Sequence, residues 1–136
     1  MTEVFFVFDT NALISAHLLG KSVSAEALNR ALKRGSLVFS DRTLSEFAEV
    51  LYRAKLDRYF VEGEREKILN IITYKSKIIK PSAKVKVCRD PKDDMFLELA
   101  LSANAACIIS GDPHLLEMHP FRGIPIMNAA DFLNNF

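Results

Sequence analysis

Acidic side chains that could act together occur at separated places along this 136-residue chain. The candidates are Asp9, Glu46, the adjacent pair Asp93 and Asp94, and Asp112. Asp9 directly follows the apolar run 4–8, and Asp112 comes shortly after a second apolar run at 107–110. In an open α/β sheet, the carboxyl ends of the strands form the crevice that binds ligands. We therefore expect these acids to converge on one crevice.

Several carboxylates in one crevice need a counter-charge. Three or four of them within a few ångströms repel strongly, and a buried unpaired charge costs far more than a helix cap contributes. A divalent cation removes this conflict, and hard oxygen ligands suit Mg²⁺ or Mn²⁺, which bridge carboxylates to a substrate phosphate. The acids therefore predict phosphodiester hydrolysis with one metal ion or two, a number that the sequence leaves open.

The elements that must position these acids can be predicted from hydrophobic patterns and helix caps. Val4–Phe8 has the composition of a strand buried on both faces, and Thr10 and Asn11 after it are good helix caps. We expect strands at 4–8, 37–40, 107–110 and 124–127, helices at 12–19, 24–34, 43–54, 62–77, 95–103 and 129–135, a short extended piece at 78–79, and a loop or edge strand at 84–87. This alternation predicts a single α/β domain over residues 1–136, a three-layer sandwich whose central, mostly parallel sheet is flanked by helices.

Composition excludes several other classes of protein. The formal net charge of +1 gives no global attraction to nucleic acid or membranes. Cys88 and Cys107 fit neither a disulfide framework nor a zinc site. No apolar run approaches the ~18 residues of a membrane span, and the acidic start Met1–Glu3 does not suit a signal peptide. We therefore expect a soluble cytoplasmic protein without membrane contacts.

Four short motifs, taken in order, resemble those of a known family. The motifs are Phe8-Asp9-Thr10-Asn11, Ser45-Glu46-Phe47, Arg89–Asp94 followed by Phe96–Ala100, and Ile109-Ser110-Gly111-Asp112. Each motif alone is weak, but their order and spacing over almost the whole chain are fairly specific. The chain resembles PIN-domain nucleases of the VapC-like subgroup, which are described as the toxins of toxin–antitoxin pairs.

The resemblance implies roles for individual residues. The implied metal-binding and catalytic acids are Asp9, Glu46, one of Asp93 and Asp94, and Asp112, with Thr10, Asn11 and Ser110 as supporting polar groups. The subgroup favours the position of Asp93, whereas counting back from Asp112 as in virulence-associated toxins gives Asp94. Successive helical residues point about 100° apart, so both cannot face a metal equally. We expect Asp93 to be the main ligand and Asp94 to support the helix start or a water.

The resemblance also implies a substrate and partners. Single-stranded RNA is the usual substrate of the family, and a small antitoxin protein is a possible partner. Apolar residues at 52–60 and at Phe132, Leu133 and Phe136 are candidates for a homodimer or antitoxin contact, although a buried role accounts for them equally well.

Simpler interpretations exist for each motif. Asp9-Thr10-Asn11 could be only a helix cap, Ser110–Pro113 only a turn, and Glu49 has the same claim as Glu46 on composition. A haloacid-dehalogenase-like phosphatase needs a second Asp where Asn11 stands, and a receiver domain has no use for Glu46. A catalytically inactive PIN-like module that binds another protein remains the main alternative.

Overall fold

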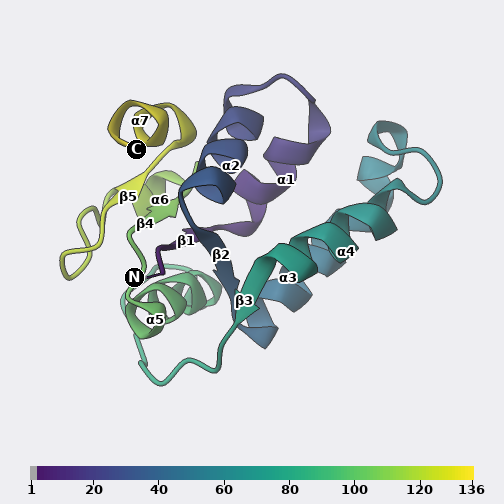
Figure 1. The fold of residues 1–136 in the computed structure, drawn as a ribbon. Coiled ribbons are helices and arrows are strands. Elements are labelled where there is room, and N and C mark those ends of the chain that lie inside the picture. Colours follow the sequence, from purple (N-terminus) through teal and green to yellow (C-terminus); the bar gives the residue numbers. More distant parts are fainter. Residues whose placement is uncertain (1–2) are drawn as a thin grey trace.

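The computed structural model of the chain describes residues 3–136, and its centre is a five-stranded sheet in the order β3-β2-β1-β4-β5 (Figure 1). All four pairs of neighbouring strands are parallel. The strands are β1 (Phe5–Phe8), β2 (Ser36–Phe39), β3 (Ser76–Ile78), β4 (Cys107–Ile109) and β5 (Ile126–Met127). The α-helices are α1 (Thr10–Leu18), α2 (Val23–Arg34), α3 (Asp41–Leu51), α4 (Glu64–Lys75), α5 (Asp94–Ala103), α6 (Pro113–Leu116) and α7 (Ala129–Asn135), and the 3-10 helices are η1 (Ala54–Tyr59) and η2 (Pro91–Asp93).

Helices cover both faces of the sheet. Phe6 and Phe8 of β1 belong to a core shared with α1, α2, α3 and α7, whereas Val7 belongs to a second core shared with α5 (Figure 1). This alternation follows from the pleat, which points successive strand residues to opposite faces. The structure confirms the predicted three-layer α/β sandwich, and it makes the sheet entirely parallel.

Polar residues at the strand ends cap the helices that follow. The Ala12 N–H donates to Asp9 Oδ1 at 2.8 Å, and so starts α1 directly after β1. Ser40 and Thr43 form a capping box that starts α3 directly after β2. Because the connections are this short, the first turns of α1 and α3 lie at the carboxyl edge of the sheet.

Several predicted boundaries differ from the structure. The helix expected at 43–54 ends at Leu51 and continues after a break as η1, and the short extended piece expected at 78–79 is the end of β3. The segment 84–87 is neither helix nor strand, so the loop interpretation is confirmed and the edge strand is wrong. The helix α6 after Asp112 was not predicted, because four residues are too few to show a period.

The apolar residues expected at a contact surface divide into two groups. Phe60 and Phe132 are buried, and Phe132 packs edge-on against Phe6 with 5.3 Å between ring centroids, so of the two roles left open by the sequence the buried one holds for them. Tyr52 and Tyr59 are exposed. Of the apolar residues expected at a contact surface, these two tyrosines are exposed enough to contact another protein.

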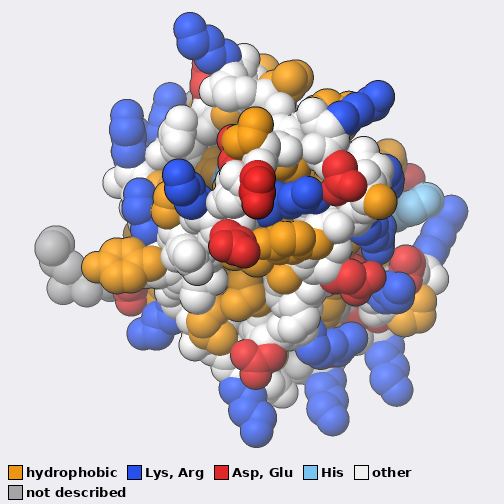
Figure 2. Space-filling view, turned by 90° about the vertical axis from the view of Figure 1, so that its right-hand side faces the viewer, with side chains coloured by type: hydrophobic (Ala, Val, Ile, Leu, Met, Phe, Trp, Pro, Cys, Tyr) orange, Lys and Arg blue, Asp and Glu red, His pale blue; other side chains and the backbone are white. Residues whose placement is uncertain are grey.

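The surface carries both signs of charge. On the face shown in Figure 2, Lys and Arg side chains project from much of the outline, and acidic and hydrophobic side chains lie among them. None of the helices within residues 3–136 combines the length and the apolar composition needed to cross a membrane. Because the positive and negative charges of the chain nearly balance, any attraction of a polyanion to this surface must be local.

Candidate active site

The register of the central strands brings together two residues that are 101 positions apart. Phe8 of β1 is paired with Ile109 of β4, so the residues that follow them, Asp9 and Ser110, stand side by side. The Asp9 N–H continues the ladder by donating to the Ile109 carbonyl at 3.0 Å. The first acid therefore has a fixed position at the carboxyl edge of the sheet.

Asp9 is a buried carboxylate whose two oxygens have different partners. Oδ1 accepts the Ala12 N–H, and Oδ2 accepts the Ser110 hydroxyl. The side chain is only 5% exposed. Burial raises the pKa of Asp9 to about 6, the two hydrogen bonds oppose this rise, and the nearby Asp112 and Glu46 carboxylates add to it. The side chain is thus held rigidly in a place that disfavours its negative charge.

Asp112 lies two residues after Ser110, in the turn that leads into α6. Its Oδ1 accepts the His114 N–H at 2.9 Å, and its own N–H donates to Ser110 Oγ at 3.0 Å. Ser110 therefore contacts both Asp9 and the backbone of Asp112 and fixes their relative position. The turn predicted at 110–113 and the acidic site are the same structure, because one Asp caps a helix and also lines a cavity.

Glu46 reaches the same edge from α3. The Thr10 hydroxyl, at the start of α1, donates to Glu46 Oε2. Thr10 is buried and Glu46 is half-buried. Since this bond ties α3 to the residue after Asp9, it selects Glu46 rather than the exposed Glu49, which instead lies 3.5 Å from Arg53 in an ion pair.

The adjacent pair Asp93 and Asp94 divides into two different roles. Asp94 is buried, and its Oδ1 accepts the N–H groups of Val87 (3.1 Å) and Cys88 (2.9 Å). Burial raises the pKa of Asp94, but the hydrogen bonds from Cys88 and Val87 outweigh it, so that the net shift is downward. Asp94 thus anchors the loop before α5, and it is not among the residues that line the acidic cavity.

Asp93, in contrast, lines the cavity with Asp9 and Asp112. Partial burial raises the pKa of Asp93 to about 6, and the neighbouring Asp112, Asp90 and Asp9 carboxylates add to the rise. The part of the rise that comes from these carboxylates reflects their closeness to Asp93. The structure therefore places Asp93, and not Asp94, among the clustered acids.

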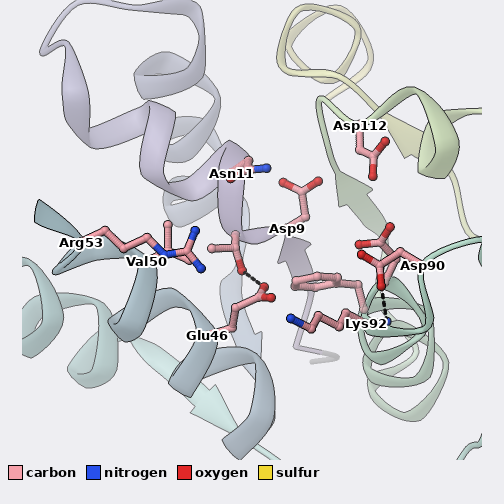
Figure 3. A pocket seen from close by; sticks show the side chains of 11 residues that line it. Asp9, Asn11, Glu46, Val50, Arg53, Asp90, Lys92 and Asp112 are labelled. Atoms are coloured by element: carbon pink, nitrogen blue, oxygen red, sulfur yellow. Dashed lines mark hydrogen bonds between the residues drawn. The ribbon is translucent and has the colours of Figure 1, made fainter. Parts of the chain in front are cut away.

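These side chains surround one cavity of about 300 Å³ (Figure 3). Asp9 and Asp112 point into the open space, with Asp90 below Asp112 and Glu46 across from them. The lining residues are Asp9, Thr10, Asn11, Glu46, Val50, Arg53, Asp90, Lys92, Asp93, Phe96 and Asp112. Every acid predicted for the site except Asp94 is present, as are Thr10 and Asn11, while Ser110 lies directly behind Asp9.

The oxygen ligands that line the cavity show whether it suits a divalent cation. Within residues 3–136, no group of three or more His, Cys, Asp or Glu side chains is arranged to hold a metal ion by itself. Mg²⁺ keeps several of its waters and usually binds through one or two carboxylates together with substrate phosphates. A cavity lined by hard carboxylate oxygens, two of whose acids have pKa values raised to about 6, fits that mode of binding.

Sequence reasoning missed the two cationic side chains and the fourth Asp of the cavity. Arg53 and Lys92 line it, and Asp90 does so while also capping η2 through the Lys92 N–H. The spacing of Glu46, Val50 and Arg53 was a usable signal, because residues at i, i+4 and i+7 lie on one side of a helix.

Comparison with known proteins gives a consistent result. The profile of the PIN domain matches residues 6–114. An uncharacterized protein of Methanocaldococcus jannaschii, MJ1680, is 31% identical over 120 residues, which are 85% of this chain and 76% of that protein.

Solved structures share the fold at low sequence identity. VapBC2 from Rickettsia felis, solved with a DNA fragment from its promoter, gives a TM-score of 0.63 at 15% identity over 92% of this chain and 98% of that one. VapBC-1 from nontypeable Haemophilus influenzae gives a TM-score of 0.60 at 15% identity, over 93% of this chain and 99% of that one. PAE2754 from Pyrobaculum aerophilum gives 0.62 at 14% identity over 96% and 88%. From the profile match, the motifs and the fold, the chain belongs to the PIN-domain family.

Proposed function

We propose that the protein is a metal-dependent ribonuclease that hydrolyses single-stranded RNA. The observation that carries this proposal is the meeting of Asp9, Glu46, Asp93 and Asp112 at one cavity, although they come from four different parts of the chain. PIN-domain proteins are nucleases, and a crevice of clustered carboxylates suits the hydrolysis of a phosphodiester.

Asp9 together with Asp93 or Asp112 would hold Mg²⁺ or Mn²⁺, as one ion or two, and Asp94 is left out of this set because its carboxylate already binds the loop. When bound, such an ion stabilises the negative charge that develops on the phosphate. Loss of the proton from Asp9 and Asp93 prepares them for this role, since their pKa values near 6 leave both mostly ionised at neutral pH.

The remaining residues of the cavity position Glu46 and neutralise the negative charge of the phosphate. Thr10 holds Glu46 through Oε2, so that Oε1 can accept a proton from a water that attacks the phosphorus. Arg53 and Lys92 bring positive charge to the cavity, where they can contact phosphate oxygens that the carboxylates would otherwise repel. This arrangement gives local attraction to RNA on a nearly neutral protein.

We further propose that the nuclease is the toxin of a toxin–antitoxin pair and acts in the cytoplasm. Two solved structures that share its fold are named as VapBC proteins, which supports a small antitoxin partner. A homodimer is part of the same proposal. Exposed apolar side chains available for either contact are Tyr52, Tyr59, Val61, Ile71 and Tyr74.

The test is cleavage of a labelled single-stranded RNA in Mg²⁺ and in chelator. We expect the wild type to cut only with the metal, and Asp9→Asn to be slower by at least about 100-fold, the upper end of what loss of a group supporting a metal ligand produces. Glu62→Gln is a matched control, because Glu62 is exposed in the turn before α4. Equal cleavage by wild type and Asp9→Asn would refute the catalytic assignment, and absence of cleavage in both would favour the inactive binding module.

A further inference from the structure

A second and larger cavity adjoins the acidic one. Its volume is about 740 Å³, and it shares Asn11 and Asp112 with the acidic cavity. Ser110, which holds Asp9 through a hydrogen bond, also lines it. An RNA strand with one phosphate among the acids would therefore have its next nucleotide at this second cavity.

The lining of this cavity differs in kind from that of the acidic one. It is formed where α1, α2, α6 and α7 begin, and Asp112 is its one charged residue among those that the structure describes. The others are small side chains, hydroxyls and two amides, and we call the space the amide cavity after Asn11 and Asn128. Because this lining contains no Lys or Arg, it has no positive side chain to bind a phosphate. Hydroxyls and amides are the groups that pair with the edges of bases.

Asn128 is well placed for such pairing. Its Oδ1 accepts the Asp131 N–H at 2.8 Å and caps α7, so its position is fixed while its amide nitrogen can donate elsewhere. Asn11 is exposed and lies beside Asp9 (Figure 3), and it lines both cavities. A side chain held by a cap has little freedom to lose on binding, which favours selective contacts.

We propose that the amide cavity binds the base of the nucleotide next to the scissile phosphate, and that it sets the base preference of the enzyme. The proposal rests on the ribonuclease function above. The base must be unpaired for its edge to reach Asn128, so the substrate class is single-stranded RNA. Ala130 is exposed at the wall of the cavity, so that a larger side chain at this position would reduce the space for a base.

The test is binding of labelled 12-residue homopolymers of A, C and U in chelator, so that no cleavage is needed. We expect wild type to bind the best of them at least about fivefold more tightly than the poorest, the lower end of what one paired base edge discriminates. Asn128→Ser should reduce this ratio toward one, because Ser also caps helices well but has no amide. Ala130→Leu should weaken binding of the purine polymer more than that of the pyrimidine polymers.

The matched control is Asn29→Ser, which removes the same group from an exposed position on α2 outside both cavities. It should leave the ratio unchanged. An equal affinity for all three polymers in the wild type, or an unchanged ratio in both Asn128→Ser and Ala130→Leu, would overturn the proposal. If those variants bind RNA normally and instead lose a bound protein partner, the cavity is a protein site and the proposal is wrong. The proposed function fails separately, through absence of metal-dependent cleavage by the wild type.

Discussion

Replacing Asp9 with Asn should make the metal-free protein more stable at neutral pH. The Asp9 carboxyl is 5% exposed, and its pKa is raised from 3.8 to about 6. An acid with a raised pKa favours folding while it is protonated. Its contribution is fully present below the unfolded value of 3.8 and is lost as the pH rises through 6. Asn keeps the shape and remains neutral, so the variant avoids that loss.

The size of the effect follows from the shift. A difference of about two pKa units corresponds to about 3 kcal/mol of unfolding free energy at pH 7.5. The entropy of unfolding is about 2.1 cal/mol/K per residue, so this gain raises the melting temperature by on the order of 10 °C. Asn can also keep both hydrogen bonds, since its oxygen can accept from Ala12 and its nitrogen can donate to Ser110 Oγ.

The assay is thermal unfolding of wild type and Asp9→Asn in chelator, from pH 4 to 8. We expect the melting temperatures of the two proteins to converge near pH 4, and that of Asp9→Asn to be the higher above pH 6. Added Mg²⁺ should then stabilise the wild type by mass action and the variant much less. The same melting temperature difference at pH 4 and pH 7.5 would refute the reasoning, because burial of a charge would not be its cause. Glu62→Gln should show no such pH-dependent difference.

Three further substitutions test the supporting structure. Asp94→Ala should destabilise the protein by about 2 kcal/mol, because the loop loses two part-buried hydrogen bonds to a charged acceptor, whereas Asp94→Asn should unfold like wild type in urea and still cleave RNA. Gly35→Ala should lower the denaturant midpoint by an amount worth about 2 kcal/mol, because its new Cβ would meet a backbone oxygen at 2.1 Å, while Gly20→Ala has open space and should be neutral or better. Thr10→Val should leave the melting temperature nearly unchanged but slow cleavage, since Glu46 loses its hydrogen bond, and an unaffected rate would show that this bond has no part in activity.

The sheet and its acidic edge were predictable because the signals are local. The run Val4–Phe8 ends at Asp9, and the run 107–110 ends shortly before Asp112, so parallel strands alone place both acids at one edge. The alternation of strands and helices then suffices for the three-layer architecture. Nothing beyond period, caps and strand order was needed.

The choice between Asp93 and Asp94 needed tertiary information. Both residues stand at the start of the same helix, where a negative side chain interacts favourably with the helix dipole. What separates them is the path of the loop before α5, whose Val87 and Cys88 N–H groups take up the Asp94 carboxylate. A loop without regular structure leaves no periodic trace in the sequence. The preference for Asp93 came from family resemblance alone.

The rest of the site depends on packing between elements distant in sequence. The amide cavity forms only where α1, α2, α6 and α7 meet, and no local pattern describes such a meeting. Burial of Phe60 and Phe132 could not be distinguished from exposure by composition, because burial depends on packing against distant elements, as between Phe132 and Phe6. Sequence patterns thus identified the acids but not the space around them.

The central claim is that a divalent cation binds among the carboxylates at the carboxyl edge of the sheet. Its most direct test is the anomalous scattering of Mn²⁺ in crystals of the wild type soaked with the metal. We predict a peak in the acidic cavity within coordination distance of Asp9, with Asp93 or Asp112 as a further ligand, and no such peak in Asp9→Asn. A wild-type cavity without a peak in fully soaked crystals, or Mn²⁺ bound only at other carboxylates, would contradict the claim.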